Sequence, residues 1–429
     1  MIALIALFAV MFLLRSPLLA PFTNAEQGTS IALGFILIFA FLFGKKMKPL
    51  NLPQITGYII AGILCGPYVL RFLSETEVKD LQLLDGLALS LIALTAGGEM
   101  KFERIRKSLK GISSIVFFQT MFIILGFILL GIIVRPRLPL LSEATGLTVL
   151  SISLLLGTLA TATSPSTTIA IITETRARGK YTDIVLSAAV VKDFFVIIIF
   201  AFALSFSKSL ASTAQRFDFR FLQHILREIG GSILIGALVG GGIILYIKFI
   251  KRDVTLFVLS VAFFTYQISQ SYGYHPLLIC LLAGFIVENL STQGERLIQA
   301  IERSSVPVYV VFFAISGASL NLEALRKTWF LALICVVWRG ALKFAGTYSG
   351  ARIAKEEPGV QKYSWAGFIS QAGVALGMAI IIEKTFPDWG SEFKALVLAI
   401  IAINQIIGPV FFQRLLYKVG EAGKREERI

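Results

Sequence analysis

The chain has 429 residues, of which 56% are hydrophobic and only 15% are charged, and its mean hydropathy is +0.80. A soluble domain of this size cannot bury so much apolar surface, so the composition indicates an integral membrane protein. The net charge of +14 would favour nucleic-acid binding in a soluble protein, but here the basic residues cluster between apolar runs as topology signals. We therefore expect a polytopic membrane protein that is not an enzyme, has no nucleic-acid partner and has no separate soluble domain.

Apolar runs separated by charged or Gly/Pro-rich breaks predict about fourteen spanning helices, at ~20 residues per span. The predicted spans are 1–20, 29–47, 53–72, 81–100, 111–134, 146–173, 182–206, 228–250, 254–272, 276–291, 305–322, 329–352, 363–384 and 393–417. Placing alternate loops on one side gathers most of the Lys and Arg residues there, which predicts that both termini are cytoplasmic. The outer segment 207–227 is predicted either as a loop or, in its second half, as an amphipathic interfacial helix.

The two halves of the chain show a weak internal similarity. TGYIIAGILCGP at 56–67 resembles HPLLICLLAGFI at 275–286, and SLIALTAGGEM at 90–100 resembles YVVFFAISGASL at 309–320. Each unit has five spans, and an odd number places two such units in opposite orientations. The predicted regions are N-terminal helices 1–49, a first inverted repeat 50–206, an outer segment with linking helices 207–274, a second inverted repeat 275–418 and a short cytoplasmic tail 419–429.

The span 146–173 contains a proline at its centre. Pro165 has no N–H and its ring clashes with the preceding turn, so the helix is predicted to break there. Non-helical backbone at membrane depth is tolerated only where it is buried in protein or lines a cavity. The hydroxyls of Thr163, Ser164 and Ser166, with the freed carbonyls, are hard oxygen ligands suited to a small cation. A simple proline kink, with the hydroxyls bonded back to the helix, is the structural alternative.

The corresponding span in the second half is 363–384. It has no proline, but the polar Gln371 followed by Gly373 could open the helix. Two facing interrupted helices would bring the ends of their half-helix dipoles together at mid-membrane.

Ionisable residues lie inside two other spans. Lys192 and Asp193 fall near the centre of 182–206, where an ionisable side chain is a functional-site hypothesis by default. Arg339 and Lys343 are four residues apart and so share a helical face. We expect these two cations to neutralise the negative ends of the interrupted helices or to pair with Asp193, although Lys343 could instead extend to the interface.

These features together resemble the monovalent cation:proton antiporter superfamily, the Na+/H+ exchanger and Kef-type membrane domain. The resemblance covers residues 50–418. The motifs that carry it are LPQITGYIIAGILCGP (52–67), LTAGGEM (94–100), TSPS (163–166), Asp193 in its apolar span, AGFIVENL (283–290), LKFAGTYSGAR (342–352) and SQAGVALGMA (370–379).

The resemblance implies an all-α fold of about 13–14 transmembrane helices, in which two inverted five-helix repeats carry crossed broken helices, 146–173 and 363–384. It implies elevator-like motion of this core against a dimerising scaffold, and hence a homodimer. It also implies that Asp193 is the carboxylate that binds the cation or the proton, with Thr163 and Ser164 beside it. Family members usually have Asp, Asn or Gln before the essential aspartate, and Lys192 departs from this pattern.

The expected function is exchange of a monovalent cation, Na+ or K+, for protons across a prokaryotic plasma (inner) membrane, with the lipid bilayer as surroundings and no resident cofactor. Lys192 leaves the stoichiometry open, because its charge either stays fixed or changes with each cycle. A sodium-coupled symporter of an organic anion is one alternative. The other is a non-transporting sensor in which Lys192 occupies the ion site.

Overall fold

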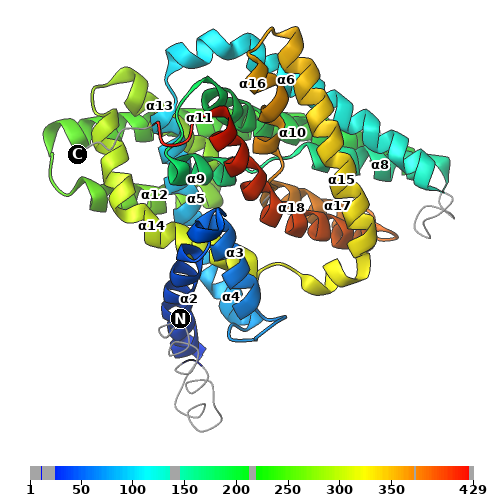
Figure 1. The fold of residues 1–429 in the computed structure, drawn as a ribbon, viewed down its shortest axis with the longest axis horizontal. Helices are drawn as coiled ribbons and strands as arrows, with labels where there is room; N and C mark the ends of the chain where they lie inside the picture. Colours follow the sequence, from blue (N-terminus) through cyan, green and yellow to red (C-terminus); the bar gives the residue numbers. More distant parts are fainter. Residues whose placement is uncertain (1–10, 12–24, 136–144, 212–218, 372, 425–429) are drawn as a thin grey trace. The chain divides into compact units, whose positions relative to one another are not determined.

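The computed structural model describes residues 11, 25–135, 145–211, 219–371 and 373–424, and within these ranges the structure is helical with no strand (Figure 1). The elements are α2 (Ala25–Lys45), η2 (Lys48–Leu50), α3 (Gln54–Cys65), α4 (Glu75–Leu81), α5 (Leu83–Glu99), α6 (Phe102–Val134), α8 (Gly146–Thr161), α9 (Pro165–Thr175), α10 (Lys180–Ala211), α11 (Phe219–Phe249), α12 (Val254–Tyr272), α13 (Pro276–Leu290), α14 (Gly294–Ala318), α15 (Leu322–Ile353), α16 (Pro358–Tyr363), η4 (Ser364–Phe368), α17 (Gly373–Thr385) and α18 (Gly390–Val419).

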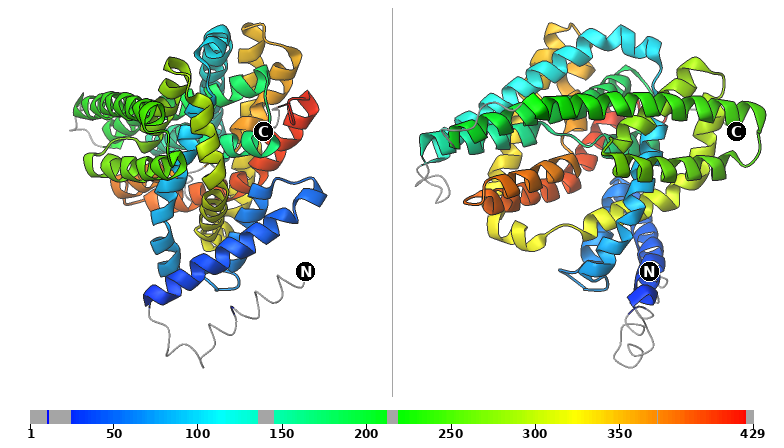
Figure 2. Two further views of the ribbon diagram at one scale, coloured as in Figure 1. Left: turned by 90° about the vertical axis from the view of Figure 1, so that its left-hand side faces the viewer. Right: turned by 180° about the vertical axis from the view of Figure 1, so that it is seen from behind.

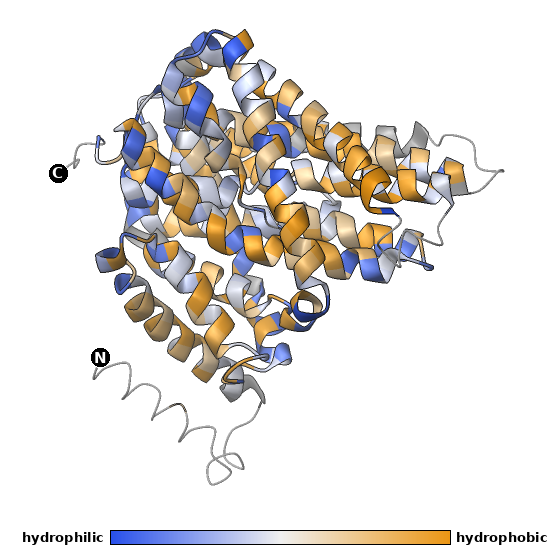
Figure 3. Ribbon diagram, turned by 45° about the vertical axis from the view of Figure 1, so that its right-hand side comes forward, coloured by the Kyte–Doolittle hydropathy of each residue, from blue (hydrophilic) through white to orange (hydrophobic). Residues whose placement is uncertain are grey.

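The helices expose apolar side chains along much of their length. Phe117, Leu238 and Val337 are 62%, 68% and 65% exposed, values that suit contact with lipid chains rather than water. Figure 3 shows the same pattern: hydrophobic residues line the helices and hydrophilic residues gather at the connections. The distribution is that of a multi-pass membrane protein.

Eight helices of the described chain are long and apolar enough to span a membrane, or ten if each of two bent pairs is one span. Two shorter apolar helices, Gln54–Cys65 and Pro276–Leu290, coincide with two further predicted spans. The predicted span 363–384 is divided among α16, η4 and α17, none of which reaches spanning length on its own. The predicted span 1–20 lies outside the described residues except for Met11.

Helix ends extend beyond several predicted spans, because helical structure continues into the polar terminal residues. In the segment 207–227, α10 continues to Ala211 and α11 begins at Phe219, so the second half is helical, as one of the two predictions had it, but as the first turns of α11. The bend of 61° within α14 precedes Pro307, which cannot donate the helical hydrogen bond and so breaks the ladder.

The chain forms two compact units. Unit 1 comprises 1–101 and 228–320, and unit 2 comprises 102–227 and 321–429. Unit 1 therefore holds α2 to α5, α11 from Glu228 onward, and α12 to α14. Unit 2 holds α6, α8 to α10, the start of α11, and α15 to α18. Within unit 2, α17 and α18 run side by side after the turn that joins them (Figure 2).

Glycines set two reciprocal helix contacts within unit 1. Where α3 packs on α14, a Cβ at Gly62 would lie 1.8 Å from the carbonyl oxygen of Ala314. At the same crossing, a Cβ at Gly317 would lie 2.1 Å from the carbonyl oxygen of Ile59. Each glycine thus contacts the carbonyl group three residues before the glycine of the other helix. Neither helix has room for a side chain at its glycine.

The second glycine contact, between α5 and α13, has the same form. A Cβ at Gly97 would lie 1.9 Å from the carbonyl oxygen of Leu281, and one at Gly284 would lie 2.3 Å from that of Leu94. The spacing of three residues is repeated. The four helices are those whose sequences resemble one another in the two predicted repeats. The first helix of each repeat, α3 or α13, packs on the second helix of the other repeat, α14 or α5.

Candidate functional site

The first interrupted helix lies in unit 2. Helix α8 ends at Thr161 and α9 begins at Pro165, whose missing N–H costs nothing at the first position of a helix. Ser164 is the N-cap of α9: its hydroxyl accepts from the backbone N–H of Thr167 and contacts the hydroxyl of Ser166 at 3.0 Å. Ser164 and Ser166 therefore use their hydroxyls to start the second half-helix.

The second interruption lies between η4 and α17 and is bonded directly to the first. The backbone N–H of Ser164 donates to the carbonyl oxygen of Ser370 at 2.9 Å. Thr168 Oγ1 donates to the carbonyl oxygen of Gly367 at 3.1 Å, and Gln371 Nε2 donates to that of Leu159 at 3.0 Å. These bonds hold the two interruptions against each other, and each satisfies a backbone group that lipid could not satisfy.

Arg339 on α15 binds the carbonyl ends left open by both interruptions. Its Nε and Nη2 donate to the carbonyl oxygens of Ala160 and Ala162, each at 2.8 Å, at the end of α8. Its Nη1 donates to that of Ile369 at 2.6 Å, after η4. The side chain is 1% exposed, so a buried guanidinium faces the negative ends of two helical segments.

Lys343 lies one turn further along α15 and has the same kind of partner. Its Nζ donates to the carbonyl oxygen of Phe368 at 2.5 Å and to that of Ala162 at 3.4 Å. The residue is fully buried, so it does not extend to the interface. On α18, Asn404 Nδ2 donates to Gln371 Oε1 at 3.0 Å and so fixes the amide that bridges to α8.

Lys192 on α10 is also fully buried, and its partner comes from another helix. Its Nζ donates to Oε1 of Gln119 on α6, while Gln119 Nε2 donates to Oγ1 of Thr347 on α15. The ring of Phe368 lies 5.2 Å from the ammonium nitrogen, within the range of a cation–π contact.

Asp193 follows Lys192 on α10 and is 6% exposed. Its Oδ1 is buried and has no hydrogen-bond partner among the described residues, and the same is true of Thr163 Oγ1 in the first interruption. An orphaned buried carboxylate oxygen is costly unless a proton or a cation satisfies it. The structure thus joins Arg339 and Lys343 to the interrupted helices through hydrogen bonds, whereas Lys192 is bonded to Gln119 on α6. Among the described residues, Asp193 and Thr163 keep open ligand atoms.

Two features of this site were not predicted from the sequence. Gln119 is a single amide in the apolar run IVFFQTMF, and a lone polar residue at membrane depth is the signal that could have identified it. Gly408 on α18 permits the backbone at Ser370 to approach, since a Cβ there would lie 2.7 Å from the Ser370 backbone nitrogen. The Gly408–Pro409 pair was a possible signal for such a close approach.

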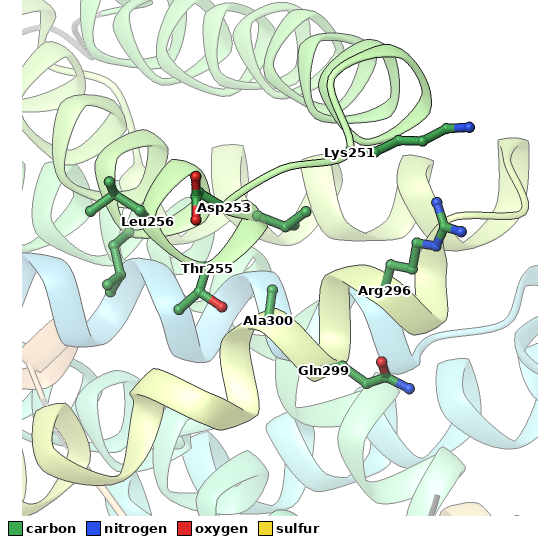
Figure 4. A pocket seen from close by; sticks show the side chains of 9 residues that line it. Lys251, Asp253, Thr255, Leu256, Arg296, Gln299 and Ala300 are labelled. Atoms are coloured by element: carbon green, nitrogen blue, oxygen red, sulfur yellow. The ribbon is translucent and has the colours of Figure 1, made fainter. Parts of the chain in front are cut away.

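Unit 1 has a separate hollow of about 490 Å³ at the start of α12 (Figure 4). Lys251, Asp253 and Arg296 line it and are exposed, so it mixes both signs of charge in a solvated setting. Across the described ranges, no three His, Cys, Asp or Glu side chains converge as a metal site would require. The buried site in unit 2 therefore offers one carboxylate, which suits a singly charged ion.

Two interrupted helices that are hydrogen-bonded to each other inside a helical bundle, with buried cations beside the interruptions, are an arrangement typical of secondary active transporters. The sequence model for "Sodium/hydrogen exchanger, transmembrane" matches residues 29–418. The chain belongs to this family.

Among similar proteins, the probable Na(+)/H(+) antiporter 3 of Methanocaldococcus jannaschii is 22% identical over 388 residues, which cover 89% of this chain and 95% of the relative. The Na(+)/H(+)-K(+) antiporter GerN of Bacillus cereus is 23% identical over 390 residues, covering 88% and 94%. The solved structure of the sodium proton antiporter MjNhaP1 from M. jannaschii matches with a TM-score of 0.68 at 16% identity, over 93% of this chain and 97% of that one. The fold is therefore that of the Na+/H+ antiporters, as the sequence predicted.

Proposed function

We propose that the protein exchanges Na+ or K+ for protons across the plasma membrane and that Asp193 is the carboxylate both ions share. The observation that carries the proposal is the open Oδ1 of Asp193, buried on a helix that packs against both interrupted helices. The buried cations Arg339 and Lys343 donate to backbone carbonyls rather than to Asp193, so the carboxylate stays open to a transported ion.

Exchange follows from competition for this single carboxylate. When Asp193 faces the cytoplasm it binds either a proton or a cation, and when it faces outward it releases one and binds the other. Thr163 Oγ1, which likewise has no partner in the part of the chain that the structure describes, would supply a further oxygen ligand to the cation. The hydroxyl of Ser164 already caps α9. We therefore expect the backbone of the interruption, rather than this hydroxyl, to supply the oxygen ligand predicted at Ser164.

We further propose that the site moves with unit 2 in an elevator-like motion and that the protein forms a homodimer with both termini in the cytoplasm. Every site residue predicted from the sequence lies in unit 2, and this supports movement of the site as one body. Homodimerisation and the orientation of the termini rest on the family resemblance and on the distribution of basic loops.

Lys192 determines the charge moved per cycle. If it stays protonated, one proton exchanges for one monovalent cation and the cycle is electroneutral. If it releases a proton when the cation binds, a second proton moves and the cycle is electrogenic. The relative GerN is named for both Na+ and K+, so both ions belong in the test.

The proposal is tested in proteoliposomes with a preset pH gradient, to which Na+, K+ or Li+ is added in turn with and without a voltage clamp. We expect cation-dependent dissipation of the gradient by the wild type, loss of it in Asp193→Asn, and retention in Asp388→Asn, which changes an exposed aspartate of unit 2. Retained wild-type exchange in Asp193→Asn would overturn the assignment.

The alternatives give other outcomes in the same assay. Uptake of an organic anion with sodium, without proton counterflow, would indicate a symporter. Silence with every cation, together with exchange gained in Lys192→Asn, would indicate a sensor whose lysine fills the ion site. The contact of Lys192 with Gln119 argues against the sensor, because it gives the ammonium a partner other than Asp193.

A further inference from the structure

Lys192 poses a problem for the proposed function on which this inference rests. A buried ammonium next in sequence to the ion-binding carboxylate would be expected to pair with it and exclude the transported cation. Adjacent residues of a helix point about 100° apart, but the four-carbon stem of lysine is flexible enough to bridge that angle. Some other group must therefore hold the ammonium if Asp193 is to stay open.

We propose that Gln119 is a positioning residue that holds Lys192 away from Asp193 and so sets the affinity for the transported cation. Gln119 Oε1 accepts from Lys192 Nζ, and this contact ties the ammonium to α6. Both side chains are fully buried, so water does not replace the contact.

The orientation of the Gln119 amide follows from chemistry. An ammonium can only donate hydrogen bonds, so the carbonyl oxygen of the amide must face Lys192. The NH2 group then faces Thr347, whose hydroxyl accepts from it. The ammonium thereby sets the orientation of the amide, and the Thr347 hydroxyl, which can donate or accept, bonds to it in that orientation.

The backbone around Gln119 is fixed by close packing. Helix α6 packs against α15, and a Cβ at Gly346 would lie 2.5 Å from Cα of Gln119. Gly346 precedes Thr347, so the same close helix contact places the amide beside the Thr347 hydroxyl.

The side chains around the ammonium differ from Gln119 in what they offer it. Phe368 presents its ring at 5.2 Å and offers no acceptor oxygen from its side chain. Arg339 and Lys343 carry the same sign of charge as Lys192 and are engaged with backbone carbonyls. Asp193, the next residue on α10, has a buried carboxylate oxygen without a partner among the described residues, and we infer that the ammonium would turn to it without Gln119.

The first test measures cation binding without transport, as the stabilisation of the detergent-purified protein by increasing Na+ or K+ in a thermal-unfolding assay. Gln119→Leu keeps the approximate size of the side chain but removes the acceptor, and we expect the apparent Kd for the cation to rise at least about tenfold. Gln413→Leu, another buried glutamine of unit 2, is the matched control and should bind as the wild type does.

The second test separates positioning from general damage by removing the ammonium as well. In Gln119→Leu combined with Lys192→Met, the Kd should return to within about threefold of that of Lys192→Met alone, because no ammonium is left to compete. Gln119→Glu, which restores an acceptor, should also keep the affinity. In liposomes, Gln119→Leu should raise KM for the cation much more than it lowers the maximal rate.

The outcomes are distinguishable. A Kd for Gln119→Leu within twofold of the wild type, or a rise that the double variant does not reverse, would overturn this inference and leave the proposed function intact. Failure of the wild type to bind any monovalent cation would overturn both. If the leucine variant does not fold, Gln119→Ser, which is too short to reach Lys192, serves the same comparison.

Discussion

Nη2 of Arg339 donates a hydrogen bond of 2.8 Å to the carbonyl oxygen of Ala162, the residue that follows the last turn of α8. The same guanidinium reaches Ile369 through Nη1, so a single planar group joins both interrupted helices. A lysine ammonium at this place could approach one of these oxygens, but it lacks the fixed fork that serves several at once. The crossing therefore depends on arginine geometry as well as on positive charge.

Arg339→Gln is expected to destabilise the protein more than Arg339→Lys. The glutamine leaves buried carbonyls without donors, at a cost of about 1–3 kcal/mol for each group left unsatisfied, whereas lysine retains the charge and part of the bonding. Thermal unfolding in detergent should rank the wild type first, Arg339→Lys second and Arg339→Gln last. Arg326→Gln, on the exposed face of the same helix, is the control and should unfold as the wild type does. Equal stability of all variants would contradict the bridging role.

The interruption at Pro165 could be predicted from the sequence because proline removes a backbone donor wherever it occurs. The interruption near Gln371 was predictable only through comparison of the two halves, since no residue there forbids a helix. The partners of Arg339 and Lys343 are backbone carbonyls, which carry no sequence signature, and only the folded chain shows which ones the cations reach.

Side-chain partners from distant helices were harder to predict. Gln119 and Lys192 are 73 residues apart, and neither residue type specifies the other. Glu421 was predicted only as part of a charged tail, yet it is 7% exposed and bonded to the start of α10. Long-range pairs of this kind depend on the packing of whole helices, and hydropathy alone does not determine that packing.

Competition at one carboxylate predicts the pH dependence of transport. As the pH falls, a larger fraction of Asp193 carries a proton and cannot bind the cation, so the apparent KM for the cation should rise while the maximal rate changes little. With one proton competing for one site, the rise approaches ~10-fold per pH unit in the acidic limb. Initial rates in liposomes at varied cation concentration and equal pH on both sides test this. A KM independent of pH would indicate separate proton and cation sites.

Glu421 is expected to stabilise the start of α10, the helix that carries Lys192 and Asp193. Its carboxylate accepts from the backbone N–H groups of Tyr181 at 2.9 Å and Thr182 at 2.8 Å, and a negative charge there complements the helix dipole. Glu421→Ala should lower stability by about 1–2 kcal/mol and speed hydrogen exchange at these two amides. Glu357→Ala removes a glutamate that is 67% exposed and should do neither. Unchanged exchange at the amides in Glu421→Ala would contradict the cap.

The reciprocal glycine contacts predict that the same substitution has opposite effects at two helical sites of unit 1. Gly284→Ala would force a Cβ to within 2.3 Å of the carbonyl oxygen of Leu94, so α5 and α13 must separate. Overpacking of this kind costs about 1–3 kcal/mol. Gly241→Ala on α11 meets no atom within 4 Å and should be neutral or stabilise by up to about 1 kcal/mol, since alanine favours the helix.

Thermal unfolding of both variants in the same detergent checks this prediction, with Gly97→Ala as the reciprocal change on α5, where a Cβ would lie 1.9 Å from the carbonyl oxygen of Leu281. Because Gly97 and Gly284 belong to one contact, their combined substitution should cost less than the sum of the two single costs, as the helices separate only once. Full additivity would mean that the two glycines pack independently. A stable Gly284→Ala variant would show that the approach of the two backbones is not required.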